Sequence, residues 1–347
     1  MDVCSEKGMG FGMSAIKIAM DAFGGDNAPD EVIKGAEQAV KAYGVEIILC
    51  GDEKTVRERM KALGVSENGI SVRNAEGVIK IEDNPTDIRK AKLNSSMGVA
   101  FQLVKNGDAD AFISAGSTAA LVVGGTTIIG RIKGVKRPSL APIIPSMNQS
   151  YILLDGGANV ECRPEMLHQF AVMGSVYMDK IMNVQSPRVG LLNVGAEEEK
   201  GRELELEAHK LLKDAPLNFI GNIEGREAAL GGCDVLVTDG FTGNIYLKTV
   251  EGMGSFMKRS LKNLFFRNIG TKIAAAFTMK GIKELSSKMD YRETGGSPLL
   301  GTAKPVIKAH GSSDAKAFKN AARQAKEFIE NNVIEEITLA LGSSDGE

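Results

Sequence analysis

Six short apolar runs of the sequence each end in a polar loop that contains glycine. These loops start at Asp21, Ser114, Asp155, Asn193, Gly221 and Asp239. Glycine lets backbone N–H groups approach an anion closely, so loops of this kind bind phosphate when a helix follows them. None of the six has the spacing of a nucleoside triphosphate loop or of the dinucleotide-binding fingerprint. We therefore expect inorganic phosphate or a phosphorylated small molecule as the ligand.

The candidate donors to a phosphate or a carbonyl oxygen are glycines and polar residues of these loops. Those that we rank first are Gly24, Gly25, Asn27, Gly116, Ser117 and Thr118. Those that we rank second are Asn193, Lys200, Asn222, Thr242 and Asn244. The competing interpretation is that the glycines only close tight turns between strand and helix, and that Lys200 is a solvated helix lysine.

Three titratable side chains are candidates for catalysis. Asp21 and Asp239 each follow an apolar run directly, where a carboxylate can orient a donor or accept a proton, or simply cap a turn. His310 lies at the start of a loop, so it is a candidate for catalysis or phosphate contact, with a purely structural histidine as the alternative. The other two histidines, His168 and His209, fall in helical patterns and are expected to be structural.

No cysteine is a candidate nucleophile or metal ligand. Cys4, Cys50, Cys162 and Cys233 lie far apart, without the paired spacing of a metal site or of a disulfide framework. Cys162 and Cys233 also lack a neighbouring histidine in the sequence. We therefore expect no metal, no acyl-enzyme intermediate and a reducing, cytoplasmic environment.

The apolar runs alternate with helical patterns, which is typical of a doubly wound α/β protein with a mostly parallel sheet. Helices are expected near residues 30–43, 54–63 and 197–213. Residues 111–130 carry no charge, but their serine, threonine and glycine content favours a strand, a loop and a buried helix over a membrane span. Because carboxyl ends of parallel strands gather along one edge, the six loops should face one crevice.

The chain is predicted to form a single catalytic unit over residues 13–347, preceded by a loose extension over residues 1–12. Prolines cluster in residues 133–146, which favours a hinge between two lobes or, equally, a proline-rich strand edge. The 42 basic and 44 acidic residues give a net charge of −2, so the composition provides no case for nucleic acid.

One segment departs from this near-neutral composition. Residues 253–288 contain eight basic residues and the single acidic residue Glu284, with apolar side chains between them. We interpret the segment as a basic amphipathic helical insertion that binds an anionic membrane or an acidic partner; the alternative is a helix pair with one solvated face and a core or dimer face. Its candidate contact residues are Lys258, Arg259, Leu261, Lys262, Phe265, Phe266, Arg267 and Ile269.

The longer motifs together resemble one protein family. They read MDAFGGDNAP at 20–29, SAGSTA at 114–119, LLDGGAN at 153–159, LNVGAEEEKG at 192–201, DGFTGN at 239–244 and KAHGS at 308–312. In this order they are similar to the motifs of the bacterial phosphate acyltransferase (PlsX) family. The resemblance runs from about Ile16 to Val333.

This resemblance implies an activity and its partners. The family moves a long-chain fatty acyl group from acyl carrier protein to inorganic phosphate, and the acyl phosphate enters phospholipid synthesis. It also implies a fold similar to phosphotransacetylases and to isocitrate and isopropylmalate dehydrogenases, a homodimer, peripheral contact with the membrane, and no organic cofactor. Phosphate is already largely dianionic near neutral pH, and a thiolate of pKa about 8.5 leaves readily, so positioning and oxyanion stabilisation are the main tasks.

Three other functions compete with this one. A phosphotransacetylase-like protein would use acetyl coenzyme A and would need a small acyl pocket and a nucleotide site. A dehydrogenase of the related fold is disfavoured by the missing dinucleotide fingerprint. A non-catalytic scaffold at the membrane surface would leave the six loops unexplained.

Overall fold

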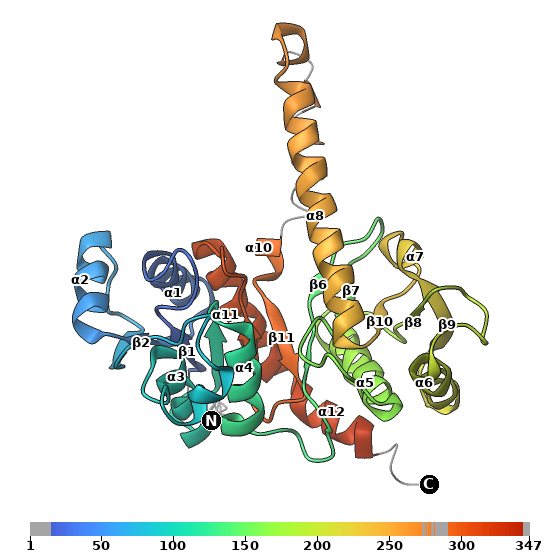
Figure 1. Ribbon diagram of the computed structural model, residues 1–347. Helices are drawn as coiled ribbons and strands as arrows, with labels where there is room; N and C mark the ends of the chain where they lie inside the picture. The colour runs from blue at the N-terminus through green and yellow to red at the C-terminus, as the bar shows by residue number, and fades with distance from the viewer. Residues whose placement is uncertain (1–14, 273–274, 276, 279–280, 282–290, 343–347) are drawn as a thin grey trace, which may run out of the picture.

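The computed structural model describes residues 15–272, 275, 277–278, 281 and 291–342. Two sheets form the body of the protein, and one long helix projects from it (Figure 1). The extension predicted for residues 1–12 and part of the basic segment predicted for 253–288 lie outside the described residues.

The larger sheet has seven strands in the order β3-β2-β1-β4-β12-β11-β5. Its strands are β1 (Lys17–Asp21), β2 (Glu46–Gly51), β3 (Ile70–Asn74), β4 (Ala111–Ser114), β5 (Ser139–Leu140), β11 (Ser297–Leu300) and β12 (Val306–Lys308). The neighbours from β3 to β12 are parallel, and β11 is antiparallel to both β12 and β5. The ends of β1, β4 and β12 therefore lie side by side at one edge.

The smaller sheet has five strands in the order β6-β7-β10-β8-β9. They are β6 (Ile143–Ile144), β7 (Tyr151–Leu154), β8 (Val189–Asn193), β9 (Phe219–Glu224) and β10 (Val235–Val237), and only β6 is antiparallel to its neighbour. Two mostly parallel sheets confirm the α/β fold class. The polar segments predicted as loops are consequently divided between two sheet edges. The loop predicted to start at Gly221 is wrong, because β9 continues to Glu224 through pairing with β8 and a helix starts at Gly225. The proline-containing residues 133–146 carry both β5 and β6, so the chain passes from one sheet to the other there.

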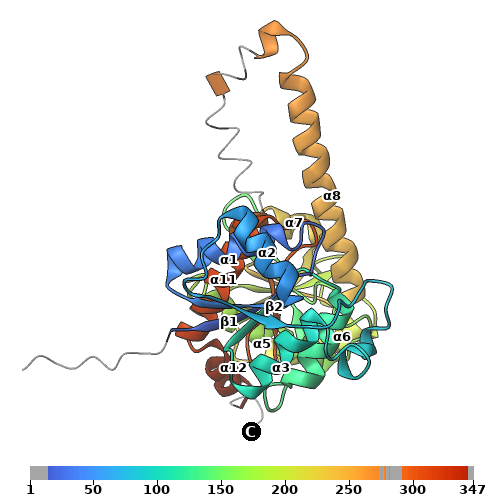
Figure 2. The same cartoon turned by 90° about the vertical axis from the view of Figure 1, so that its left-hand side faces the viewer.

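Helices cover both sheets, as Figure 2 shows for α1, α2 and α3 beside the larger one. Around the larger sheet lie α1 (Asp30–Tyr43), α2 (Glu53–Leu63), the short helix η1 (Pro85–Arg89), α3 (Ser96–Asn106), α4 (Thr118–Gly124), its π-helical continuation η2 (Gly125–Ile129), α10 (Tyr291–Thr294) and α11 (Ala315–Glu330). The others are α5 (Pro164–Lys180), α6 (Glu203–Asp214), α7 (Gly225–Ala229), α8 (Gly240–Phe265) and α12 (Val333–Gly342). In the part of the chain described above, we find no helix whose length and hydropathy would let it cross a membrane.

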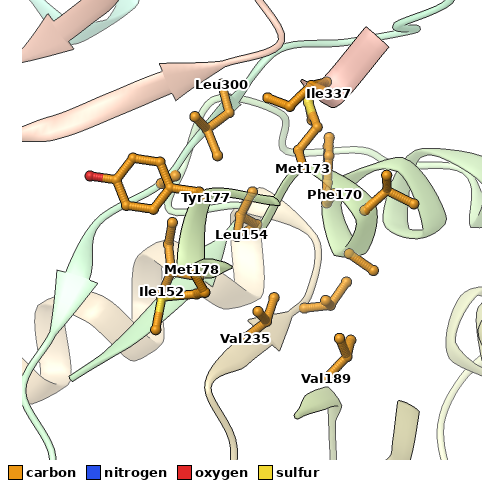
Figure 3. Close-up of a cluster of buried hydrophobic side chains, with 14 of the residues drawn as sticks. Ile152, Leu154, Phe170, Met173, Tyr177, Met178, Val189, Val235, Leu300 and Ile337 are labelled. Atoms are coloured by element: carbon orange, nitrogen blue, oxygen red, sulfur yellow. The ribbon is translucent and has the colours of Figure 1, made fainter. Parts of the chain in front are cut away.

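The two sheets share buried side chains. Figure 3 shows the cluster under the smaller sheet, where Ile152, Leu154 and Val235 pack against Phe170 of α5. Leu300 of β11 belongs to the larger sheet but lies in this same cluster. Burying such side chains favours folding by roughly 25 cal/mol per Å² of apolar surface. The two halves of the body are thus packed as one unit around a common core.

The base of α8 is packed closely against the smaller sheet. A Cβ atom on Gly243, in the first turns of α8, would lie 1.9 Å from the carbonyl oxygen of Asp155. Farther along α8, a Cβ on Gly252 would meet no atom within 4 Å. One glycine of the helix is therefore required by packing and the other is not.

This contrast gives a stability prediction. We expect Gly243→Ala to lower the free energy of unfolding by about 1–3 kcal/mol, because the methyl group displaces the helix from the loop that carries Asp155. Gly252→Ala is the matched control, and we expect it to raise the free energy of unfolding by about 0.5–1 kcal/mol through the lower entropy of the unfolded chain. Chemical denaturation of both variants measures the effect, and equal changes in the two would contradict the packing described here.

Candidate active site

A cavity of about 1490 Å³ lies between the two sheets and the inner side of α8. Its wall is mostly apolar and is formed by Val122, Val123, Ile143, Ile144, Leu247 and Val250. Most of these side chains are half-buried, with one side packed on a core cluster and the other facing the cavity. Polar side chains also line it, among them Thr118, Asn244, Lys248, Lys308, His310 and Ser312.

The adjacent ends of β1, β4 and β12 carry a buried polar group. The Ser114 hydroxyl donates a hydrogen bond of 2.7 Å to Oδ2 of Asp21, and the Phe23 N–H donates one of 3.2 Å to Oδ1. Burial raises the pKa of Asp21, and these hydrogen bonds oppose that rise. Asp21 does not line the cavity, so it can position Ser114 and the following loop without contacting a ligand.

The glycines ranked first lie in the loops after β1 and β4, beside the hydrogen-bonded pair of Asp21 and Ser114. A Cβ on Gly24 would lie 2.5 Å from Oδ2 of Asp21, and Gly25 has a φ of +100°, where glycine is strongly favoured. The Gly116 N–H donates to the Ser114 hydroxyl at 2.9 Å, and the Ser117 hydroxyl accepts from the Ala120 N–H at 3.4 Å. These hydrogen bonds and close contacts within the protein account for the glycines at 24, 25 and 116 and for Ser117.

The remaining two first-ranked residues have different surroundings. Asn27 donates from its amide nitrogen to the carbonyl oxygens of Ser312 and Ser313, at 3.2 and 3.3 Å. It therefore holds the loop that follows β12. Thr118 lines the cavity at the start of α4.

Lys308, at the end of β12, was not among the predicted site residues. Its Nζ donates to the carbonyl oxygens of Ala309 at 2.5 Å and Ala115 at 3.4 Å. The pKa of Lys308 is lowered to about 8, mainly by burial and also by the charge of Lys248, whereas Asp21 and Asp26 act in the opposite direction. The only signal in the sequence was a lysine directly at a strand end beside His310.

His310 lies in the loop after β12 and lines the cavity. Its Nδ1 accepts a hydrogen bond of 3.2 Å from the backbone N–H of Ser312 and lies 2.8 Å from the Ser312 hydroxyl. Because a backbone N–H can only donate, the neutral imidazole carries its proton on Nε2. Desolvation lowers the pKa of His310, with Glu251 opposing and Lys248 reinforcing that change. The ring is therefore suited to donate a hydrogen bond from Nε2.

The second-ranked residues lie mainly at the edge of the smaller sheet. Asn193 donates to the carbonyl oxygen of Lys200 at 2.9 Å, and Asn222 donates to that of Glu197 at 2.7 Å, so both hold the loop after β8. Lys200 itself is exposed. Of this group only Asn244 lines the cavity, where its amide also donates to the Gly156 carbonyl at 3.3 Å.

Asp239 forms the start of α8. Its Oδ1 accepts from the Thr242 N–H at 2.7 Å, and its Oδ2 accepts from the Thr242 hydroxyl at 3.0 Å and from Nη2 of Arg202 at 2.6 Å. Asp239 and Thr242 thus cap and orient the helix, and neither lines the cavity. Arg202, the ion-pair partner of Asp239, was not predicted.

Asp155 starts one of the six loops identified in the sequence, but it was not among the candidate site residues. It is fully buried at the end of β7, and its carboxylate accepts from the N–H groups of Leu140, Gly157, Ala158 and Asn159 and from the Asn159 amide, at 2.6–3.1 Å. Gly156, Gly157 and Ala158 line the cavity. Asp155 therefore fixes this part of the cavity wall.

The contact residues predicted for the basic segment fall into two groups. Lys258, Leu261, Lys262, Phe265 and Phe266 line the cavity where it continues along α8. Arg259, Arg267 and Ile269 are exposed and do not line it. Among the residues that the structure describes, no three His, Cys, Asp or Glu side chains are placed to hold a metal ion.

Solved structures with the same fold are phosphotransacetylases. One from Streptococcus pyogenes aligns with a TM-score of 0.62 and 21% identity over 91% of this chain and 94% of its own. The EutD phosphotransacetylase from Staphylococcus aureus aligns with a TM-score of 0.57 and 21% identity over 90% and 94%. The two sheets and the cavity between them therefore define an α/β protein with the phosphotransacetylase fold.

Sequence comparison specifies the family. The family described as fatty acid synthesis protein matches residues 16–336. The phosphate acyltransferase of Thermoanaerobacter pseudethanolicus is 47% identical over 96% of this chain and 99% of its own length. That of Caldanaerobacter subterraneus subsp. tengcongensis is 49% identical over 93% and 96%. The chain belongs to the phosphate acyltransferase (PlsX) family and is an enzyme of that class, which confirms the resemblance.

The environment of Lys308 gives a prediction for its titration. We expect its ammonium group to lose its proton near pH 8, against an ordinary value of 10.5, because burial disfavours the charged form. Reductive ¹³C-methylation of the lysines and NMR titration measure this value, with Lys308→Arg assigning the signal. Lys248→Met should raise the midpoint only partly, since burial is the larger cause. A midpoint above about 10 would contradict this description.

Proposed function

We propose that the enzyme transfers a long-chain fatty acyl group from acyl carrier protein to inorganic phosphate, giving acyl phosphate for phospholipid synthesis. The observation that carries the proposal is a single cavity with both an apolar wall and a polar region. Val122, Val123 and Leu247 belong to that wall, and Lys308 and His310 belong to the polar region. The acyl chain would lie along the wall, and its thioester carbonyl would lie beside the polar residues.

The volume of the cavity favours a long acyl group. Pockets for small molecules usually measure roughly 300–1,000 Å³, whereas this cavity measures about 1490 Å³ and continues along α8 to Leu261 and Phe265. Burial of each methylene of a bound chain contributes about 0.8 kcal/mol. An acetyl group would use little of this surface. The phosphotransacetylase-like alternative, which the fold alone supports, is therefore ranked second.

The reaction that we propose is direct attack by phosphate. A phosphate oxygen attacks the thioester carbonyl carbon and forms a C–O bond, the C–S bond breaks, and the carrier leaves as a thiolate that takes up a proton. The Nε2–H of His310 and the hydroxyl of Thr118 are the proposed donors to the oxyanion. Asp21 is a positioning residue through Ser114, and Asp239 is one through the start of α8.

The three cysteines within the described residues give no support for an acyl-enzyme route. Burial raises the pKa of Cys162 to about 12 and that of Cys233 to about 12. Cys50 is buried. A thiol that stays protonated at neutral pH is a poor nucleophile. This supports attack by phosphate itself.

We propose that α8 contacts acyl carrier protein, the membrane surface or a second copy of the chain. Lys258 and Lys262 give α8 positive charge toward an acidic carrier protein or an anionic membrane. Apolar side chains exposed along α8, including Ile245, Met253 and Phe256, are candidates for contact with a second copy in a homodimer. We therefore propose a cytoplasmic enzyme that contacts the membrane peripherally.

A comparison of acyl donors tests the proposed function. With phosphate present and a chelator added, we expect long-chain acyl carrier protein to react with a kcat/KM at least about a hundredfold above that of acetyl coenzyme A, because only the long chain buries surface in the cavity. Mass spectrometry of the acyl phosphate measures the product. A preference for acetyl coenzyme A would support the phosphotransacetylase-like alternative, and turnover that requires an added divalent ion would contradict a metal-free reaction.

Filling the cavity should alter the choice of acyl group. We expect Val123→Phe to lower kcat/KM for a long-chain donor by about tenfold or more while changing that for a short-chain donor little, because the ring occupies space near the apolar wall. Val194→Phe is the control, since Val194 is 83% exposed and does not line the cavity. Equal losses with both chain lengths in a folded Val123→Phe enzyme would place the acyl chain elsewhere.

A further inference from the structure

Two lysines from different parts of the fold face the same cavity. Lys308 lies at the end of β12, and Lys248 lies on α8, one turn beyond Asn244. The charge of Lys248 disfavours the charged form of Lys308 and so lowers the pKa of Lys308. Lys248 was absent from the residues that the sequence indicated, because a single lysine in a long basic helix has the pattern of a solvated face.

We propose that Lys248 and Lys308 together bind the phosphate substrate between α8 and the end of β12. This inference rests on the proposed function, because it assigns the place of the nucleophile in that reaction. It adds a residue of the long helix to the site, so α8 would supply part of the phosphate-binding site as well as part of the acyl-binding wall.

Lys248 and Lys308 line one cavity, and their positive charges repel. An anion of charge near −2 bound between them would reverse the sign of that interaction. Among the described residues, Asp21 and Asp26 attract Lys308, and Oε2 of Glu251 lies 2.8 Å from the Lys248 Nζ. Two further acidic residues of the cavity, Glu293 and Asp314, are paired with Lys316 and Arg292, respectively. The ion pair of Lys248 and Glu251 is exposed and contributes little, so exchanging it for phosphate is not costly.

Hydrogen bonds within the protein fix the ammonium group of Lys308. Two carbonyl oxygens, of Ala115 and Ala309, accept from the Lys308 Nζ and hold it in place. An ammonium group has three N–H donors, so one more can be directed to a ligand. A lysine that is fixed in this way loses less conformational entropy when it binds an anion than a mobile surface lysine does.

The glycine loops, which the sequence predicted to bind phosphate, already make hydrogen bonds and close contacts within the protein. The Gly116 N–H already donates to the Ser114 hydroxyl, and the position of Gly24 is set by its contact with Asp21. Of the basic side chains that line the cavity, Lys308 lies at a strand end beside these loops and Lys248 lies one turn beyond Asn244, whereas Lys258 and Lys262 lie farther along α8. Phosphate between Lys248 and Lys308 would also lie near His310, next to the proposed position of the thioester carbonyl.

A second anion of similar chemistry is the phosphodiester of the prosthetic group that carries the acyl chain. Kinetics separate the two sources, because free phosphate and the carrier are varied independently. We expect Lys248→Ala to raise the KM for phosphate by about tenfold or more, with kcat and the KM for the acyl carrier within about threefold. Lys248→Arg should stay within about threefold of wild type, since it keeps the charge.

The matched control is Lys41→Ala. Lys41 forms a similar helical ion pair, with Glu37 at 2.7 Å, on α1 and does not line the cavity. A readout independent of turnover is the stabilisation of the full-length protein by phosphate against thermal unfolding, compared with chloride at equal ionic strength. Wild type, Lys248→Arg and Lys41→Ala should gain this stabilisation, and Lys248→Ala should lose most of it.

The outcomes distinguish the inference from the proposed function. An unchanged KM for phosphate in Lys248→Ala would overturn the inference, and so would a raised KM for the carrier alone, which would assign the lysines to the phosphodiester. If wild type forms no acyl phosphate but phosphate stabilises it in a Lys248-dependent way, the proposed function fails and the anion site remains.

Discussion

The carboxylate of Asp155 is the group on which the arrangement of the two sheets depends. It directly follows β7 of the smaller sheet, and its Oδ1 accepts a hydrogen bond of 3.1 Å from the N–H of Leu140 in β5 of the larger one. Burial raises the pKa of Asp155, while N–H groups of the loop that follows it favour the ionised form. Because an unsatisfied buried carboxylate is costly, the loop must keep the conformation that supplies these donors.

This constraint extends to the long helix. The Asn159 amide donates to Asp155 and to the Pro138 carbonyl, and the Asn159 carbonyl accepts from the N–H of Gly240, the first residue of α8. Gly243 then contacts the carbonyl of Asp155 closely, and Asp239 joins the helix start to Arg202. The direction of α8 is therefore set by the same loop that joins the sheets, so this loop also determines where α8 borders the cavity.

Elements with a local sequence pattern, such as apolar strands, could be predicted from the sequence. Features that depend on contacts between residues distant in the sequence could not. The apolar runs became the buried strands β1, β4, β7, β8 and β10, since burial on both faces leaves an apolar pattern that is visible locally. The sixth run became part of β9, which is an edge strand in which Ile220 is 42% exposed. The helix predicted for 197–213 begins only at Glu203. Gly201 has a φ of +105°, and Asn193 and Asn222 hold the carbonyls of Lys200 and Glu197 in a loop. Those two contacts come from neighbouring strands, so no local pattern shows them.

The same limit applies to the candidate site. Glycines near Asp21 and Ser114 were found because they are frequent in loops, but a glycine that permits close packing has the same sequence pattern as one that binds an anion. The structure separates the two cases at Gly24, where a side chain would collide with the Asp21 carboxylate. Lys248 and Lys308 are about sixty residues apart in the sequence, and only the fold brings them to one cavity. When each charged residue of an anion site comes from a different element of the fold, no sequence motif identifies the site.

The cavity wall shows how an apolar surface for the proposed acyl group is compatible with folding. Val122 and Val123 pack against the core beside the larger sheet, Ile143 against the core of the smaller sheet, and Leu247 and Val250 against the cluster around Tyr151. Each side chain buries one side in the protein and presents the other to the cavity. Folding is thus stabilised by the buried sides alone, and the remaining apolar surface stays available to a ligand. A bound acyl chain would complete the burial of three clusters at once, so its affinity would depend on how the loop of Asp155 places them.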